Sequence, residues 1–456
     1  MDEIDVADQV RSGLLAELGD APLVVDPDVI EAYRVDRATS VVPGRPVALV
    51  RARDTADVQA VLRVASRFGV PVVPRGLGTG LSGGSTAIDG CIVLSTEQMR
   101  SLSIDAAAMV ATVGPGIRNA ELKDAAAAAG LWYPPDPSSF EICSIGGNLA
   151  TNAGGLCCVK YGVTTDYVLG MEVVLADGRA IRLGGRTIKD VAGYDLKRLF
   201  VGSEGTLGVI TEAVLRLRPP PPPASTVVAT FASVADAGRA VTRIVAEVRP
   251  AALELMDRAA MAAVEQVQPM GLDPDAAALV LARTDAGGDE ADRITVACEA
   301  AGAVYVARTD DVDEGELLMG ARRMAIPCVE RLGTVLIEDV GVPVPRIPEL
   351  LVAVEAIAAR YRTAIPVIGH AGDGNFHPLV TYDPGDAGAA ERAAQAFDAV
   401  MEAALALGGT ITGEHGIGML KAGHLATQLG SDVMDLTRRV KQALDPDNIL
   451  NPGKWV

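Results

Sequence analysis

Five consecutive prolines, Pro219 to Pro223, interrupt the chain near its middle. Proline lacks a backbone N–H and fixes φ at about −65°, so such a run continues neither a helix nor a central strand and favours extended, semi-rigid geometry. The run therefore predicts a linker over residues 219–224. A chain of 456 residues also exceeds one core of roughly 100 to 200 residues, so we expect a large domain on each side of the linker.

The apolar spacing on the N-terminal side switches between strand and helix periods. Val47 to Val50 and Val70 to Val73 read as short buried strands, and Thr55 to Phe68 between them reads as an amphipathic helix. A helical stretch at Val6 to Leu18 precedes them. We therefore expect a helical leader over residues 1–45 and a first α+β domain over residues 46–218.

The same alternation resumes after the linker. Val227 to Phe231 reads as a strand and Ala235 to Val248 as a helix. This pattern predicts a second α+β domain over residues 225–413. We treat residues 414–456 as a separate C-terminal segment.

Charge and cysteine usage exclude several classes of protein. The net charge of −19 gives no broad basic surface for nucleic acid, and no run reaches the ~18 apolar residues that span a bilayer. The acidic start, Met1 to Asp5, lacks the pattern of a signal peptide, so we expect a cytoplasmic protein. The six cysteines show no Cys-x-x-Cys spacing, which favours reduced thiols and excludes zinc-finger chemistry.

The run Pro74 to Ser85 contains the spacing Gly78-x-Gly80-x-x-Gly83, which superficially matches a dinucleotide fingerprint. That fingerprint requires a helix after the third glycine, whereas Ile88 to Leu94 reads as a turn and a strand. The context therefore excludes a nicotinamide site of the Rossmann type. Such a loop can instead present successive backbone N–H groups to phosphate oxygens, because glycine admits positive φ values.

Two further segments are rich in glycine, and the first of them also contains asparagine. The first runs from Pro134 to Ser139 and continues through Cys143 to Gly155, and the second runs from Gly193 to Thr211. Glycines let the backbone approach a flat ligand closely, and asparagine amides both donate and accept hydrogen bonds at ring edges.

With these three segments the sequence resembles the FAD-binding domain of the vanillyl-alcohol oxidase and para-cresol methylhydroxylase flavoproteins. Within that family it is similar to the FAD-linked D-2-hydroxyacid dehydrogenases, the group of D-lactate dehydrogenase, the glycolate oxidase catalytic subunit and D-2-hydroxyglutarate dehydrogenase. The resemblance covers residues 45 to 456. It implies a two-subdomain FAD-binding domain, an α+β cap domain for substrate and a C-terminal segment that returns to the FAD site.

The resemblance assigns the pyrophosphate to the first glycine run, the flavin and adenosine to residues 135–155, and the adenine side to residues 204–210. The implied cofactor-binding residues are Pro74, Arg75, Gly76, Leu77, Gly78, Thr79, Gly80, Leu81, Ser82, Gly83, Pro135, Asp136, Ser138, Ser144, Gly147, Asn148, Thr151, Asn152, Gly154, Glu204, Gly205, Ile210 and Asn451. Relatives often attach flavin through histidine, but all four histidines here lie between 370 and 424. We therefore expect non-covalent FAD, with a link through Cys143 as the alternative.

Three of the four histidines lie in two compact patterns, Gly369 to His377 and Gly413 to Gly418. Two imidazoles from His370 and His377 and a carboxylate from Glu414 suit a catalytic Zn²⁺, with Mn²⁺ or Fe²⁺ possible on the same ligands. The resemblance agrees that these three are the metal ligands. It further implies His415 as the catalytic base and Asn375 as a polar substrate contact.

Two neighbouring polar residues have structural alternatives. Asp373 either orients a ligand imidazole or caps the turn between Gly372 and Gly374. His424 begins a predicted helix, and we interpret it as structural.

An anionic substrate needs a local cation in so acidic a chain, and the planar fork of arginine suits a carboxylate. By similarity Arg322 takes this role, with Arg346 as an alternative, while Arg323 is expected to extend to solvent. Where D-2-hydroxyglutarate dehydrogenases place threonine and lysine, this chain aligns Ile326 and Ile337. Leu379 likewise replaces a polar residue, so a monocarboxylate such as lactate or glycolate is favoured.

The implied reaction is oxidation of a D-2-hydroxyacid to the 2-oxoacid, with metal assistance, His415 as base and hydride transfer to flavin N5. The sequence leaves the reoxidant open among a quinone, a cytochrome, an electron-transfer flavoprotein and oxygen. A homodimer and an oxidase complex are both open as assemblies, and a peripheral location at the inner membrane is an alternative to a purely cytoplasmic one. The alternatives are D-2-hydroxyglutarate dehydrogenase, a flavoenzyme of the alkyl-dihydroxyacetone-phosphate synthase type, and a non-catalytic FAD subunit of an oxidase complex.

Overall fold

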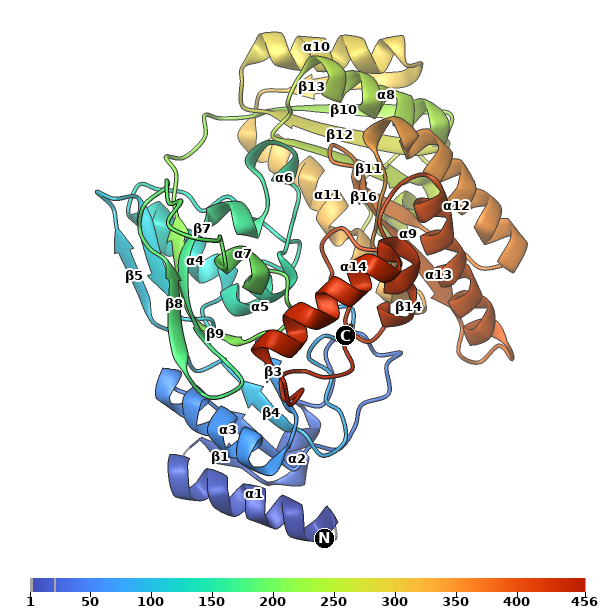
Figure 1. Ribbon diagram of the computed structural model, residues 1–456. Coiled ribbons are helices and arrows are strands. Elements are labelled where there is room, and N and C mark those ends of the chain that lie inside the picture. Colours follow the sequence, from blue (N-terminus) through green and yellow to red (C-terminus); the bar gives the residue numbers. More distant parts are fainter. Residues whose placement is uncertain (1–2, 20–21, 456) are drawn as a thin grey trace. The chain divides into compact units, whose positions relative to one another are not determined.

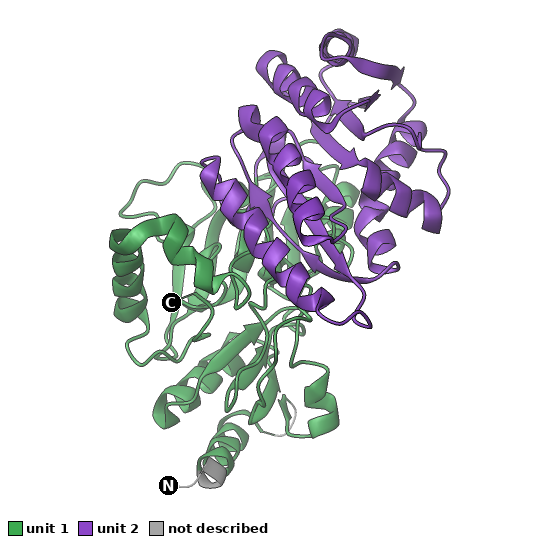
Figure 2. Ribbon diagram, turned by 90° about the vertical axis from the view of Figure 1, so that its right-hand side faces the viewer, with its two compact units in different colours: residues 1–153, 163–220, 414–456 green, residues 154–162, 221–413 purple. Residues whose placement is uncertain are grey.

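The computed structural model describes residues 3–19 and 22–455, and the chain divides into two compact units (Figure 2). Unit 1 comprises residues 1–153, 163–220 and 414–456, and unit 2 comprises residues 154–162 and 221–413. One boundary therefore lies within the proline run, between Pro220 and Pro221. The other lies between Gly413 and Glu414, next to His415.

Unit 1 is built on two sheets (Figure 1). The first is four-stranded, in the order β1-β2-β4-β3, with strands β1 (Leu23–Val24), β2 (Ala48–Arg51), β3 (Val72–Arg75) and β4 (Ile92–Ser95). The second is five-stranded, in the order β5-β6-β9-β7-β8, with strands β5 (Leu102–Asp105), β6 (Val110–Val113), β7 (Val168–Val174), β8 (Ala180–Gly184) and β9 (Val209–Arg216).

The helices of unit 1 pack on these sheets and connect them. They are α1 (Glu3–Leu18), α2 (Pro27–Glu31), α3 (Thr55–Phe68), α4 (Asn119–Ala128), α5 (Ile145–Thr151), the 3-10 turn η1 (Thr164–Tyr167), α7 (Lys197–Phe200) and α14 (Ala422–Leu444). The helix predicted at Thr55 to Phe68 is confirmed at both ends. Asp54 caps its first turn by accepting from the Asp57 N–H, and Gly69 at φ 64° ends it in the left-handed conformation.

Buried hydrophobic clusters on both sheets support unit 1. The apolar face of α3 packs with β2, β3 and β4, and Val61, Leu62 and Leu94 are fully buried there. The second core joins the five-stranded sheet to α4 and α5 through Leu122, Tyr133 and Leu149, among others. The glycine run is therefore attached to a strand, β3, that is packed in the first core, and the segment before α5 is attached to a helix packed in the second.

The C-terminal segment adds to the four-stranded sheet. Leu450 forms a parallel bridge with Val72, and the Asn451 N–H donates to the Val72 carbonyl at 2.8 Å. Lys441 on α14 donates to the carbonyls of Thr206 and Leu450. The segment is therefore part of unit 1, as the expected return to the FAD-binding domain requires.

Unit 2 contains one eight-stranded antiparallel sheet in the order β13-β10-β12-β11-β16-β17-β14, with β15 also paired to β17. Its strands are β10 (Ser225–Phe231), β11 (Ala252–Asp257), β12 (Ala278–Thr284), β13 (Ala303–Thr309), β14 (Thr334–Ile337), β15 (Val340–Gly341), β16 (Val367–His370) and β17 (Asn375–Tyr382).

Helices cover both faces of this sheet: α8 packs with α10 and α12, and α9 packs with α11 (Figure 1). The helices are α6 (Cys158–Tyr161), α8 (Val234–Glu247), α9 (Arg258–Val267), α10 (Gly288–Ala300), α11 (Val312–Glu330), the 3-10 turn η2 (Val344–Arg346), α12 (Ile347–Tyr361) and α13 (Ala389–Ala406). The strand and helix predicted after the linker correspond to β10 and α8. Because both faces are covered, β11 and β12 are buried along nearly their whole lengths, and a charged residue in them is exceptional.

The short stretch 154–162 lies in unit 2, although the sequence assigns it to the first domain. The physical reason is a polar tie, since Lys160 and Tyr161 both bond the carboxylate of Asp285, which follows β12. A side chain at Gly372 would also meet Val159 at 2.8 Å, so this stretch lies close against the turn after β16.

Within residues 3–19 and 22–455, no helix is long and apolar enough to cross a membrane. None of the six cysteines, all of which lie in these ranges, forms a disulfide.

Candidate functional site

The glycine run begins with the last two residues of β3, Pro74 and Arg75, and continues as turns and bends toward β4, so the exclusion of a Rossmann helix is confirmed. At Gly76 an added Cβ would lie 2.5 Å from Ser144 Oγ and 3.6 Å from the Gly147 nitrogen. The first and second glycine-rich segments therefore lie in direct contact at a place that admits no side chain. We refer to these two contacting segments as the cradle.

Positive φ is needed at only some of these glycines. Gly78 and Gly83 have φ of 70° and 79°, and an added Cβ at Gly78 would meet the Arg75 guanidinium at 2.0 Å. At Gly84 the constraint is space, because a Cβ would lie 3.0 Å from a Glu204 carboxylate oxygen. The loop thus combines the left-handed turns expected of a phosphate-binding nest with close backbone approach.

Asn451 lies against this loop and is 1% exposed. Its amide donates to the carbonyls of Gly84 and Glu204 at 2.8 and 2.7 Å. Its Oδ1 is buried and has no hydrogen-bond partner among the described residues. A buried acceptor left unsatisfied is costly, so the loop and Asn451 together fit a ligand that carries both phosphate oxygens and a donor group.

The second predicted segment is organised around α5. Ser144 caps α5 by accepting from the Gly147 N–H, and the Asn148 amide bonds Cys143 Sγ at 3.2 Å. Burial raises the pKa of the Cys143 thiol, which disfavours the thiolate that a flavin link would need. Asn152 ends α5 in the left-handed conformation, and its Oδ1 accepts from the Thr165 N–H.

Glu204 holds the C-terminal segment rather than lying open toward a ligand. Its two carboxylate oxygens accept from the N–H groups of Ile417 and Gly418 at 2.7 and 2.8 Å. Leu420 donates its N–H to the Ser82 carbonyl of the glycine run at 3.0 Å. The turn that follows His415 is therefore fixed to the same loop that forms the cradle.

In unit 2, His370 and His377 occupy the two strands of the β16–β17 hairpin. Ile368 lies opposite His377 in the register, and because His370 is two residues from Ile368, both histidines project from one face of the sheet. Their rings meet edge to face with centroids 5.3 Å apart, and both side chains are buried. Each offers a ring nitrogen within 4.8 Å of the other, a spacing that suits a shared metal ion.

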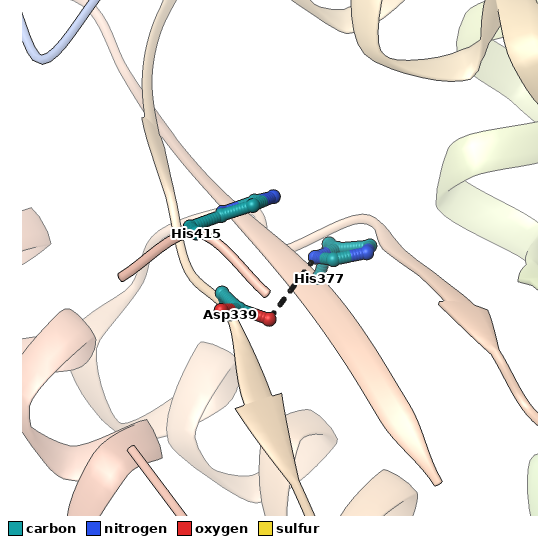
Figure 3. A group of neighbouring side chains, drawn as sticks. All are labelled: Asp339, His377 and His415. Atoms are coloured by element: carbon teal, nitrogen blue, oxygen red, sulfur yellow. Dashed lines mark ion pairs between the residues drawn. The ribbon is translucent and has the colours of Figure 1, made fainter. Parts of the chain in front are cut away.

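Each of these histidines faces a buried carboxylate through Nδ1. For His370 it is Glu254, whose oxygens lie 2.9 and 3.0 Å from Nδ1. For His377 it is Asp339, at 3.7 Å, and Figure 3 shows this ion pair, with His415 also drawn. At His370, where the carboxylate lies within hydrogen-bond distance of Nδ1, this arrangement leaves Nε2 to carry the lone pair that a metal ligand needs.

Both carboxylates were missed by the sequence reasoning. Glu254 stands alone among apolar neighbours in the run Ala251 to Met256, and one charge inside a buried strand was a usable signal. Asp373 accepts from the Asn375 N–H at 3.4 Å, which fits the turn-capping alternative, and an orienting role for Asp373 stays a prediction.

Asn375 donates its amide to Asp339 Oδ1 at 2.6 Å and to the Val340 carbonyl at 3.1 Å. Asp339 also accepts from the Thr412 hydroxyl and from the Gly413 N–H, both at its Oδ2. Asn375 therefore helps to fix Asp339, and a substrate contact by Asn375 stays a prediction. Glu414 and His415 follow directly on Gly413 in the chain.

Arg322 lies on α11 and is 2% exposed, and its Nε pairs with Glu254 Oε2 at 2.9 Å. Arg323, in contrast, is 36% exposed and pairs with Glu316, which agrees with the prediction that it extends to solvent. Arg346 is also open to solvent and pairs with Glu349. Of the three arginines, Arg322 alone lies beside the histidine pair.

The comparisons with known proteins fit this division of the chain. A family model described as the FAD binding domain matches residues 46–184, and one described as the C-terminal domain of FAD linked oxidases matches residues 220–455. Glycolate oxidase subunit GlcD of Bacillus subtilis is 43% identical over 91% of this chain and 90% of its own. D-lactate dehydrogenase of Archaeoglobus fulgidus is 37% identical over 93% of this chain and 96% of its own.

Solved structures share the fold. The 4-ethylphenol oxidase of Gulosibacter chungangensis superposes with a TM-score of 0.81 over 99% of this chain and 97% of its own, at 19% identity. A p-cresol methylhydroxylase superposes with a TM-score of 0.80 over 99% and 96%, at 18% identity. The two domain matches and the relatives lead to one conclusion: the chain belongs to the FAD linked oxidases and is an FAD-linked oxidoreductase.

Proposed function

We propose that this protein oxidises a D-2-hydroxyacid of the lactate or glycolate type to the 2-oxoacid, with non-covalent FAD and a divalent metal ion. The observation that carries the proposal is the buried pair of imidazoles, His370 and His377, each facing a carboxylate through Nδ1 and accompanied by Arg322. Relatives named glycolate oxidase subunit and D-lactate dehydrogenase support the substrate class.

The FAD cradle is proposed to consist of the glycine run, the segment around α5 and Asn451. The backbone contact at Gly76 and the buried Oδ1 of Asn451 both fit a bound dinucleotide. When bound, FAD supplies at its N5 the acceptor for the hydride that leaves C2 of the substrate. The four histidines all lie beyond residue 369, which supports a cofactor that is not attached through histidine.

The proposed metal ligands are His370, His377 and Glu414. Two imidazoles and one carboxylate with open positions suit a catalytic Zn²⁺, and Mn²⁺ or Fe²⁺ accept the same donors. Such an ion supplies Lewis acidity toward the 2-hydroxyl group. The Gly413 N–H donates to Asp339 Oδ2 at 2.8 Å. The backbone residue directly before Glu414 is therefore fixed.

Two side chains of the protein act on the substrate in this proposal. Arg322 binds the substrate carboxylate, because a guanidinium is a planar fork of five N–H donors that suits a carboxylate. His415 accepts the proton of the 2-hydroxyl, a role that suits an imidazole with an ordinary pKa of about 6.5. The Glu204 clamp on Ile417 and Gly418 fixes the turn from which His415 projects.

The environment of the substrate tail favours a monocarboxylate. Ile337 on β14 pairs with Leu379 on β17, and both join Ile326 in one apolar cluster. A second substrate carboxylate placed there would lose its hydration without gaining a cation. This argument favours lactate or glycolate over 2-hydroxyglutarate as substrate.

The test is a pair of single substitutions followed by anaerobic mixing with the hydroxyacid. His415→Ala is expected to keep FAD and metal but to lose flavin reduction. His424→Ala on α14 serves as the control, because His424 lies outside the proposed machinery, and it should reduce flavin like the natural protein. Normal flavin reduction by His415→Ala would remove His415 as the base.

A further inference from the structure

Glu254 is a carboxylate enclosed within the middle of a buried strand. It is 0% exposed, and its neighbours Leu253 and Leu255 and its partner Leu281 on β12 are all apolar. An ionised carboxylate in such surroundings is costly unless it is paired and hydrogen-bonded. Its two partners are His370 and Arg322, the proposed metal ligand and the proposed substrate anchor.

The contacts join three groups at one point. Both Glu254 oxygens lie within 3.0 Å of His370 Nδ1, and Oε2 also lies 2.9 Å from Arg322 Nε. The three side chains come from β11, β16 and α11. The Glu254 carboxylate therefore contacts both the proposed metal ligand, His370, and the proposed substrate anchor, Arg322.

The backbone fixes the distance between Glu254 and His370. Strands β11 and β16 pair with Leu255 opposite Gly369, which sets Glu254 and His370 next to each other along the ladder. The Gly372 N–H then donates to the Leu253 carbonyl at 3.0 Å, which holds the turn after His370 on the same strand. At Gly369 a Cβ would meet the Phe376 ring at 2.4 Å, so the strands tolerate no side chain beside His370.

We propose that Glu254 is a positioning residue that accepts the Nδ1–H of His370, aims Nε2 at the metal, and holds Arg322 in place for the substrate carboxylate. This inference rests on the proposed function. Partners of this kind fix the ring and the tautomer of a ligand histidine, and their loss weakens metal binding by about 10 to 100-fold. A second reading is that Glu254 serves only as the counter-charge of Arg322, and the experiment is designed to separate the two.

The experiment compares three variants as FAD-loaded proteins. Glu254→Leu removes the acceptor, Glu254→Gln keeps one acceptor oxygen without the charge, and Glu254→Leu combined with Arg322→Met removes the whole ion pair. Glu290→Gln is the matched control, since Glu290 is a buried carboxylate of the same unit that accepts from the Thr284 hydroxyl. Zn²⁺ affinity is measured by competition with a chelator, and unfolding by urea.

Glu254→Leu should bind Zn²⁺ about 10 to 100-fold more weakly than the natural protein, and Glu254→Gln should lie between them. The double variant should regain the stability that Glu254→Leu loses, because it leaves no buried unpaired charge, yet its Zn²⁺ affinity should stay low. Glu290→Gln should bind Zn²⁺ normally. Natural Zn²⁺ affinity in a folded Glu254→Leu, or full recovery of affinity in the double variant, would overturn the positioning role.

A second measurement does not depend on metal. Imidazole nitrogen NMR of the metal-free protein reports the tautomer of each of the four histidines, and a His370→Asn sample identifies the His370 signal. The expected form carries its proton on Nδ1, and Glu254→Leu should lose that preference. A proton on Nε2 in the natural protein contradicts the inference. If the natural protein binds no divalent ion, the proposed function is contradicted. The His370 tautomer then still tests the role of Glu254, because its measurement needs no metal.

Discussion

The Glu204 carboxylate accepts the N–H of Ile417 at 2.7 Å, although 213 residues separate them in the chain. This bond and a second one from the Gly418 N–H tie Glu204 to the turn that follows His415. Gly416 is part of the fit, because an added Cβ would lie 2.6 Å from Glu204 Oε1. Cofactor cradle and proposed base are therefore linked inside unit 1.

Replacement of Glu204 by alanine removes both bonds. We expect Glu204→Ala to lose about 1 to 3 kcal/mol of unfolding free energy, since each of the two hydrogen bonds contributes about 0.5 to 1.5 kcal/mol. Flavin reduction should also slow, because the turn that carries His415 loses its clamp. Urea unfolding and stopped-flow reduction measure the two effects. Glu212→Ala, which removes a partly exposed carboxylate paired with Arg182, is the control and should cost at most about 1 kcal/mol.

Glu204 also predicts a pH dependence of stability. Burial raises the pKa of Glu204 from 4.5 to about 7, although the N–H groups of Ile417 and Gly418 and the Lys454 ammonium act in the opposite direction. Between these values the folded state holds a proton that the unfolded state has released, so the contribution of Glu204 to stability falls as pH rises from about 4.5 to about 7. Glu204→Gln lacks this loss.

The measurement is the melting temperature of both proteins across that pH range at constant FAD. The melting temperature of Glu204→Gln relative to that of the natural protein should rise as pH rises. A difference that stays constant, or that shifts toward the natural protein, would show that Glu204 titrates near its ordinary pKa in the folded state.

A substitution at Gly76 tests whether the two contacting glycine-rich segments bind FAD. Gly76→Ala places a Cβ 2.5 Å from Ser144 Oγ, and we expect the purified protein to carry at least about tenfold less FAD because the two glycine-rich segments must separate. Gly185→Ala is the matched control, since no atom lies within 4 Å of a Cβ there. The flavin-to-protein absorbance ratio is the readout, and equal ratios in the two variants would contradict the cradle.

Particular residues show what the sequence could and could not predict. Thr55 to Phe68 was predictable because its amphipathic spacing, its Asp54 cap and its terminal Gly69 all agree locally. The closeness of His370 and His377 was predictable because histidine is rare in this chain and clusters in two motifs, while metal binding by them stays a prediction. The lone charge of Glu254 in an apolar run was a usable signal of something unusual, but the partners of Glu254 and Asp339 were not predictable. Those partners depend on which strands pair, and strand pairing joins residues more than 100 positions apart, such as Leu255 and Gly369.

The pair of Arg322 with Glu254 predicts how substitutions at Arg322 behave. Arg322→Met leaves a buried carboxylate without its cation and should cost about 3 to 5 kcal/mol in unfolding free energy. Arg322→Lys keeps the charge but loses the planar fork, so it should fold better than Arg322→Met while its KM for the hydroxyacid rises. Urea unfolding and steady-state kinetics check both statements, and an unchanged KM in Arg322→Lys would remove Arg322 as the carboxylate anchor.

The most direct measurement is anaerobic mixing of the purified flavoprotein with matched D and L forms of lactate and 2-hydroxyglutarate, together with glycolate, while visible flavin absorption is followed. D-lactate or glycolate should bleach the flavin, and both L-lactate and D-2-hydroxyglutarate should do so far more slowly, as the apolar cluster of Ile326, Ile337 and Leu379 requires for a dicarboxylate. Flavin that stays oxidised with every hydroxyacid would contradict the proposed dehydrogenase function.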